Sequence, residues 1–170
     1  MLISSNYVKQ LRQMHESGKF NGTSGRKHLS TINYLIGKVG VKSILDYGSG
    51  VDSFGVIADI QVTEYDPAVP GKAAMPSSAD LVICTDVLEH VEPRSLRDVL
   101  AHIHSLTLKV CFLVIATRPA DKRLPDGRNA HLIIDNAAWW VEQLRMFTWS
   151  VWINSMDDGE MVMWLRKDNI

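Results

Sequence analysis

Four short strand-like runs in the middle of the chain restrict the fold more than any other feature of this sequence. They lie within VKSILDYGSG (41–50), QVTEYDP (61–67), SADLVICTDVLEHV (78–91) and KVCFLVIATRPA (109–120). Their apolar residues are mostly continuous rather than alternating, which is typical of strands covered on both faces. A helical pattern at 95–106 separates the last two runs. The pattern predicts an α/β fold, a three-layer α-β-α sandwich around a mostly parallel sheet.

Helical and strand patterns also flank these runs. Residues 6–17 and 26–38 predict two N-terminal helices, and residues 134–146 predict a C-terminal one. The alternating stretch 147–155, a turn at 156–159 and the returning stretch 161–167 predict an antiparallel strand pair. A chain of 170 residues is expected to form one compact domain of about six strands. We expect residues 1–40 to be an N-terminal helical cap and residues 41–170 to be the sheet domain.

The charge balance and the cysteines exclude several classes of protein. There are 18 lysines and arginines against 19 acidic residues, a net charge of −1, so we do not expect long duplex DNA as a substrate. Cys84 and Cys111 each lie inside an apolar run, which indicates buried, reduced thiols rather than a disulfide scaffold or a zinc finger. We find no apolar stretch long enough for a signal peptide or a membrane span. The expected location is the cytoplasm, with no membrane partner.

Acidic residues and glycines follow the first two strands. Asp46 ends the first strand, and Gly48 and Gly50 follow it, where glycine lets the backbone turn sharply and approach a ligand. Asp66 ends the second strand, 18 residues after Gly48, which is the placement for gripping a ribose diol. The alternative is that Asp66-Pro67 is only a strand-terminating turn.

The runs ILDYGSG, VTEYDP and DLVICTDVLEHVEP, followed by a strand and an αββ tail, resemble class I S-adenosylmethionine-dependent methyltransferases, in particular small phage and bacterial ones. The resemblance covers roughly residues 26–168 and implies a Rossmann-like fold with S-adenosylmethionine as the cofactor. It implies a cofactor site made of seven residues: Asp46, Gly48, Ser49, Gly50, Asp66, Thr85 and Asp86. The 13 residues from Pro67 to Ala79 are too few for a helix and a strand. We therefore expect the third strand of the usual fold to be missing, and the helix between Gly50 and Ile60 to have about two turns.

A polar cluster follows the third run. Asp86, Glu89 and His90 have the spacing of one helix face, and His131 follows the next strand. The cluster resembles two metal-dependent O-methyltransferase groups, one acting on small RNAs and one on catechol-like compounds. The resemblance implies a Mg²⁺ or Mn²⁺ site formed by Asp86, Glu89, His90 and His131, with Asp86, His90 and His131 catalytic. The alternative is that Glu89 and His90 only cap and pack this turn.

The sequence favours methyl transfer to a small-molecule, nucleotide or sugar-type acceptor, with oxygen as the expected acceptor atom. A catalytically silent cofactor-binding partner subunit is the alternative. A nucleotide-dependent oxidoreductase is disfavoured because the full GxGxxG pattern is absent. Lys122, Arg123 and Arg128 follow the fourth strand, and they are either a solvated loop or a clamp for a phosphate or carboxylate.

Overall fold

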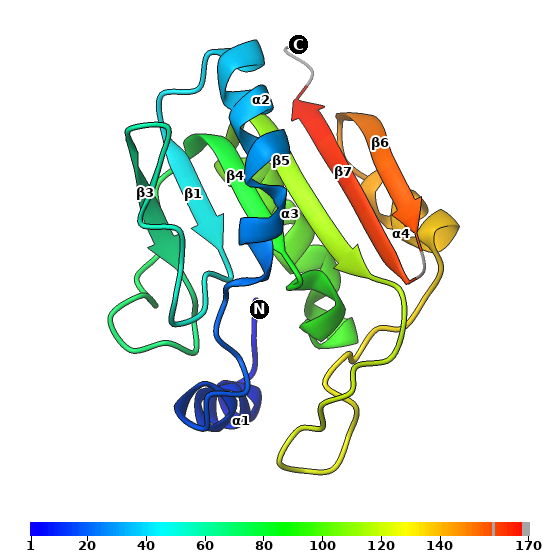
Figure 1. Ribbon diagram of the computed structural model, residues 1–170. Coiled ribbons are helices and arrows are strands. Elements are labelled where there is room, and N and C mark those ends of the chain that lie inside the picture. Colours follow the sequence, from blue (N-terminus) through cyan, green and yellow to red (C-terminus); the bar gives the residue numbers. More distant parts are fainter. Residues whose placement is uncertain (158, 168–170) are drawn as a thin grey trace.

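The computed structural model describes residues 1–157 and 159–167, which form a sheet flanked by helices (Figure 1). The sheet has seven strands in the order β2-β3-β1-β4-β5-β7-β6. The strands are β1 (Ile44–Tyr47), β2 (Val56–Ile57), β3 (Ile60–Tyr65), β4 (Ala79–Thr85), β5 (Thr107–Ala116), β6 (Trp149–Asp157) and β7 (Glu160–Lys167). β3, β1, β4 and β5 are parallel to one another, whereas β7 is antiparallel to β5 and to β6.

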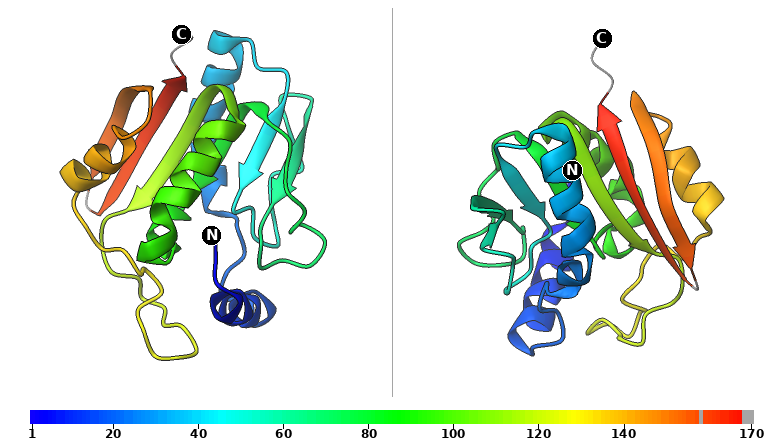
Figure 2. Two further views of the ribbon diagram at one scale, coloured as in Figure 1. Left: turned by 180° about the vertical axis from the view of Figure 1, so that it is seen from behind. Right: turned by 45° about the horizontal axis from the view of Figure 1, so that its top comes forward.

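Helices cover both faces of the sheet. The helices are α1 (Ser5–Glu16), α2 (Leu29–Val39), α3 (Leu96–Leu106) and α4 (Ala137–Leu144), with 3₁₀ turns η1 (Ser24–His28), η2 (Leu88–His90) and η3 (Pro93–Ser95). Helix α2 lies on one face, α3 and α4 lie on the other, and α1 lies beyond the ends of the strands (Figure 2). The predicted three-layer sandwich is confirmed.

The side chains of the central strands alternate between the two faces of the sheet, and on both faces they are buried from solvent. Leu81 and Ile83 of β4 pack with Ile32 of α2, while Val82 and Cys84 pack into the core that α3 completes. All five side chains have 0% of their surface exposed. This double burial explains why the strands appear as continuous apolar runs in the sequence. Both cysteines are buried and free, as the sequence predicted.

The edge of the sheet beside β3 differs from the prediction. Residues 51–59 contain no helix; they form turns and the two-residue strand β2, which pairs antiparallel with β3. The expected two-turn helix is therefore wrong, and the sheet has seven strands rather than about six. Ala58 and Asp59 have φ angles of 48° and 61°, so they form a tight turn that returns the chain from β2 to β3.

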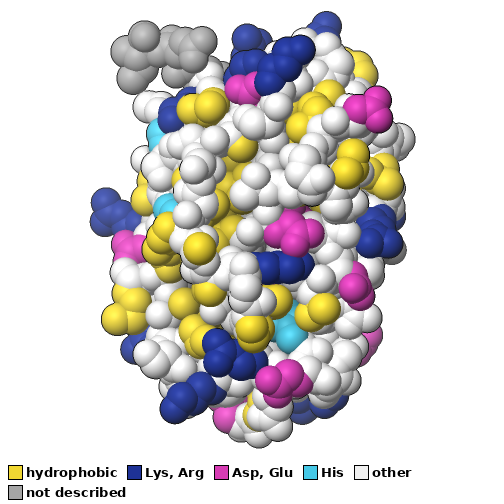
Figure 3. Space-filling model, turned by 90° about the vertical axis from the view of Figure 1, so that its left-hand side faces the viewer, with side chains coloured by type: hydrophobic (Ala, Val, Ile, Leu, Met, Phe, Trp, Pro, Cys, Tyr) yellow, Lys and Arg dark blue, Asp and Glu magenta, His cyan; other side chains and the backbone are white. Residues whose placement is uncertain are grey.

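The absence of the third strand of the usual fold, by contrast, was predicted correctly. Residues 66–78 contain neither helix nor strand, so no further strand follows β3 along the chain. The surface on this side of the molecule mixes apolar and charged side chains of both signs (Figure 3). The C-terminal antiparallel pair β6–β7 is also confirmed, although the turn expected at 156–159 includes residue 158, which lies outside the described residues.

The N-terminal segment has two different surroundings. Ile32, Leu35 and Ile36 of α2 belong to the same buried cluster as the sheet, so α2 is one layer of the sandwich. Helix α1 instead packs through Tyr7 and Met14 against the loop that follows β5. The domain boundary at residue 40 stays a prediction. Among the described residues, we find no helix with the length and apolarity needed to cross a membrane.

Candidate active site

A cavity of about 510 Å³ lies at the carboxyl ends of the parallel strands. Residues that follow β1, β3, β4 and β5 line it, and α1 and the loop before η1 close it from the other side. Strand β1 has parallel neighbours on both sides, so the cavity lies at the switch point of the sheet. Ligands of open α/β sheets bind at this place. The volume is within the usual range for small-molecule sites, roughly 300–1,000 Å³.

The turn after β1 forms the floor of this cavity. Gly48 and Gly50 have φ angles of 79° and 59°, and the backbone N–H groups of Gly48 and Ser49 both donate to the carbonyl oxygen of Tyr65. A Cβ at Gly48 would lie 2.4 Å from a methyl carbon of Val87. Glycine is therefore required at position 48 by both the backbone angle and the space. Gly48 and Gly50 line the cavity as predicted, whereas Ser49 is buried and does not.

Asp66 connects the ends of β1 and β3. Its Oδ2 accepts the backbone N–H of Gly50 at 3.1 Å, and its Oδ1 accepts that of Ala68 at 2.9 Å. His15 Nε2 lies 3.8 Å from Oδ2. The carboxylate lines the cavity, and each oxygen retains a lone pair for a ligand. Asp66 therefore stabilises a strand-terminating turn, which was the alternative interpretation, and its carboxylate also faces the cavity.

Asp46 is placed differently. Its side chain is buried, and its Oδ2 accepts the Ser53 hydroxyl at 2.6 Å. Burial raises the pKa of Asp46 to about 7. Asp46 is not among the cavity-lining residues. It anchors the segment after the glycine turn instead of lining the cofactor site that the resemblance implied.

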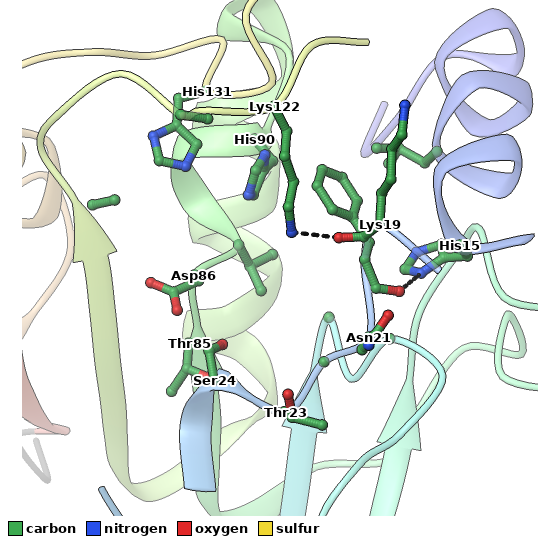
Figure 4. Close-up of a pocket in the computed structure, with 18 of the residues that line it drawn as sticks. His15, Lys19, Asn21, Thr23, Ser24, Thr85, Asp86, His90, Lys122 and His131 are labelled. Atoms are coloured by element: carbon green, nitrogen blue, oxygen red, sulfur yellow. Dashed lines mark hydrogen bonds between the residues drawn. The ribbon is translucent and has the colours of Figure 1, made fainter. Parts of the chain in front are cut away.

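Thr85 and Asp86 end β4 and line the cavity. Asp86 has a φ of 54°, an uncommon conformation for a residue with a side chain, and its N–H donates to the carbonyl oxygen of Val114. Figure 4 shows Asp86 beside Thr85, on the cavity side of the strand end. The left-handed backbone turns Asp86 away from the 3₁₀ turn of residues 88–90.

Glu89, His90 and His131 come together on the opposite wall. One ligand atom of each lies within 4.8 Å of the others, and the two imidazole rings are 4.8 Å apart. The Nδ1 atoms of His90 and His131 hydrogen-bond to the carbonyl oxygens of Ala130 and Arg118. A carbonyl accepts only a proton donor, so both Nε2 atoms keep a lone pair. Asp86, the fourth residue of the predicted metal site, is not in this group.

Glu89 is fully buried, and its two carboxylate oxygens differ in their hydrogen bonding. Its Oε1 accepts the backbone N–H of Ala116, but its Oε2 has no hydrogen-bond partner among the described residues. Burial raises the pKa of Glu89 to about 8 and lowers that of His90 to about 4. A buried carboxylate oxygen without a partner is costly. Glu89 Oε2 and the two lone-pair nitrogens are three ligand atoms that could hold a cation.

The sequence predicted an N-terminal cap at residues 1–40, but none of the contacts that hold this cap on the site. The loop after α1 lies directly on the glycine turn: a Cβ at Gly22 would lie 2.1 Å from the Ser49 carbonyl oxygen, and Asp52 N–H donates to Asn21 O. Phe20 contacts the His90 ring at 4.9 Å. This loop is rich in glycine and polar residues, a composition typical of any solvent-exposed turn.

Two further charged groups come from distant parts of the chain. Glu160, the first residue of β7, lines the cavity and pairs with Lys27 at 2.6 Å. Lys122 also lines the cavity, whereas Arg123 and Arg128 bond within their own loop, to Gly127 O and to Asp126. Only Lys122 of the three predicted clamp residues therefore faces the cavity.

No protein-family model matches this sequence, and no curated protein matches it. The structure is similar to solved methyltransferases. The 1,6-didemethyltoxoflavin N1-methyltransferase of Burkholderia thailandensis, with its substrate and S-adenosylhomocysteine bound, gives a TM-score of 0.65 at 16% identity, over 96% of this chain and 90% of that one. DhpI, in complex with S-adenosylmethionine and HEP, gives 0.62 at 15% identity, over 96% and 99%.

An O-methyltransferase family protein from Burkholderia thailandensis gives a TM-score of 0.61 at 14% identity. It matches 84% of this chain, but the match spans only 56% of that protein's length. At these identities the similarity shows the fold. The predicted Rossmann-like architecture, with parallel central strands and an antiparallel C-terminal edge, is confirmed.

Proposed function

We propose, from the class I S-adenosylmethionine-dependent methyltransferase fold that this chain has, that it transfers a methyl group from S-adenosylmethionine to an oxygen atom of a small hydroxyl-bearing acceptor. The acceptor class includes nucleotide-type and sugar-type compounds. One observation carries the proposal: a single cavity is bordered by the Gly48–Gly50 turn with Asp66 on one side and by His90 and His131 on the other.

The floor of the cavity is suited to the cofactor. The glycine turn admits a ligand close to its backbone, and Asp66 offers carboxylate lone pairs to the ribose hydroxyls. Thr85 and Asp86 line the cavity at the end of β4, whose neighbours are β1, with its glycine turn, and β5, which precedes His131. The reactive methyl group would lie near them. Solved proteins of the same fold hold S-adenosylmethionine or S-adenosylhomocysteine, which supports this assignment.

The opposite wall is suited to the acceptor. His90 is neutral near pH 7 because burial lowers its pKa to about 4, and its Nε2 accepts a hydrogen bond from an acceptor hydroxyl. His131 Nε2 provides a second acceptor beside it. Catalysis would come mainly from holding the oxygen in line with the sulfonium. Without a cation the histidines would receive the hydroxyl proton; with a cation on their Nε2 atoms the proton would leave to water.

The same wall fits a divalent cation. Two imidazole nitrogens and one carboxylate oxygen converge there, and the partnerless Oε2 of Glu89 is the observation that supports a cation. Nitrogen ligands favour Mn²⁺ over Mg²⁺. When bound, such an ion supplies a Lewis acid that lowers the pKa of the acceptor hydroxyl. Asp86 is left as a cavity-wall carboxylate near the cofactor.

Turnover separates this proposal from a silent cofactor-binding subunit. The protein, with Mn²⁺ added, is incubated with methyl-labelled S-adenosylmethionine and a panel of catechols, sugars and nucleotides. We expect labelled O-methyl product and one S-adenosylhomocysteine per transfer. His131→Ala should lower the rate by at least about 100-fold. His104→Ala should not, because His104 is a half-buried histidine outside the cavity whose ring packs on Trp149. Bound cofactor without transfer to any acceptor would favour the silent subunit.

A further inference from the structure

Three cationic side chains line the cavity without a carboxylate partner. Lys19 follows α1, and Arg118 and Lys122 follow β5. Among the residues that the structure describes, no acidic group lies within ion-pair distance of these three. The other lining lysine, Lys27, is already paired with Glu160. Within the described part of the chain, these three charges at the mouth of the cavity therefore form no ion pair.

Lys122 is the best placed of the three. Its ammonium donates to the backbone carbonyl of Lys19 and lies 5.4 Å from the centre of the Phe20 ring. Figure 4 shows its side chain reaching from the loop after β5 toward Lys19, beside His90. Phe20 contacts the His90 ring at 4.9 Å. The ammonium is thus held close to the wall where the acceptor oxygen is expected.

The acidic residues that line the cavity are largely engaged elsewhere. Asp66 accepts two backbone N–H groups, and Glu160 is held by Lys27. Asp86 and Asp121 remain, and Asp121 is an exposed neighbour of Lys122. A bound sulfonium would add a further positive charge. Lys19, Arg118 and Lys122 are themselves exposed, so a ligand that brings negative charge to the mouth would be favoured by direct charge-assisted hydrogen bonds.

We propose that Lys122, with Arg118, binds a phosphate group of the acceptor at the mouth of the cavity, so that the substrate is a small phosphate ester with a free hydroxyl. This inference rests on the proposed methyl transfer. A guanidinium binds phosphate through two parallel hydrogen bonds, and an ammonium adds a compact charge. A phosphate at Lys122 leaves the hydroxyl of the same molecule only a few bonds from His90 and His131.

Inorganic phosphate is the probe, titrated into the apoprotein by NMR at constant ionic strength with a chelator present. The chelator removes any metal that would bind phosphate itself. We expect saturable shifts in the loop after β5, and at least about fivefold weaker binding in Lys122→Met, which loses one charge-assisted contact. Lys38→Met makes the same charge change at an exposed position of α2 and should stay within twofold of the unmodified protein.

Three outcomes would overturn the phosphate site: no saturation, equal losses in Lys122→Met and Lys38→Met, or acetate competing as well as phosphate at equal ionic strength. The last result would indicate a general anion site without preference for phosphate. The proposed methyl transfer is tested by a separate measurement, the binding of S-adenosylmethionine. If the unmodified protein does not bind S-adenosylmethionine, methyl transfer is excluded whatever the phosphate titration shows.

Discussion

Two buried aspartates at strand ends have different partners and should respond differently to substitution. Asp66 faces the cavity and holds backbone N–H groups, whereas Asp46 holds the Ser53 hydroxyl inside the protein. The family resemblance placed both in the cofactor site. It could not distinguish them, because the direction of each side chain depends on the turn that comes after it.

The raised pKa of Asp46 predicts a pH-dependent effect on stability. Burial raises this pKa to about 7 from an ordinary value near 4. The folded protein therefore favours the neutral acid. This stabilisation is fully present below about pH 4 and is lost as the pH rises to 7.

In Asp46→Asn the amide oxygen still accepts the Ser53 hydroxyl but carries no charge. We expect urea unfolding to show the variant gaining stability relative to the unmodified protein between pH 4.5 and pH 8. The gain should be on the order of 3 kcal/mol, because a tenfold change in proton affinity corresponds to about 1.4 kcal/mol. A stability difference that stays constant over this range would contradict the assignment.

The partnerless oxygen of Glu89 predicts its role in cation binding. Glu89→Gln preserves the shape of the neutral acid but removes the carboxylate, so Mn²⁺ binding followed by electron paramagnetic resonance should weaken at least about tenfold. Asp86→Asn removes the same charge nearby and should bind Mn²⁺ as the unmodified protein does. Equal affinity in both variants would exclude Glu89 as a ligand.

At the scale of elements, the loop between α1 and η1 packs closely against the turn after β1. Gly22 has a φ of 82°, and a Cβ there would lie 2.1 Å from a backbone oxygen. Gly71 has a φ of 85° with open space around it. Both alanine variants carry the strain of a left-handed residue, about 1–2 kcal/mol. Only Gly22→Ala also separates the loop from the turn.

We therefore expect Gly22→Ala to lower the free energy of unfolding by at least about 1 kcal/mol more than Gly71→Ala. Thermal and urea unfolding of the two variants side by side provide the measurement. Equal losses would mean that the loop does not pack on the glycine turn as described.

The sequence predicted the strands of the central sheet because their burial on two faces leaves a continuous apolar run. It missed β2 because Val56 and Ile57 are too few to form a periodic pattern. It grouped Asp86 with Glu89 and His90 by assuming a helix from residue 86 onward. The 3₁₀ turn covers only residues 88–90, and the φ of 54° at Asp86 lies outside it. His131 was placed correctly because the ends of neighbouring parallel strands meet at one edge.

At the scale of the whole molecule, the parallel sheet brings separate loops to one edge and α1 with the loop after β5 covers them. The succession of strands along the chain, apart from β2, was predictable because each strand carries its own pattern. A cap at residues 1–40 was expected, but its contacts were not predictable, since they join Phe20 to His90 and Lys122 to Lys19 across about 70 to 100 residues of chain. Such contacts leave no periodic signal in the sequence.

The most direct test of the account is calorimetric titration of S-adenosylmethionine into the unmodified protein, Asp66→Ala and Asp80→Ala. Asp80 is also buried and accepts a backbone N–H, from Lys42, but it lies at the start of β4, the opposite end from the cavity. Both variants lose a buried carboxylate, and circular dichroism must confirm that both are folded. We expect Asp66→Ala to lose about 1.5–3 kcal/mol of binding free energy and Asp80→Ala to bind as the unmodified protein does. Unchanged affinity in folded Asp66→Ala, or no binding by the unmodified protein, would contradict the cofactor site described above.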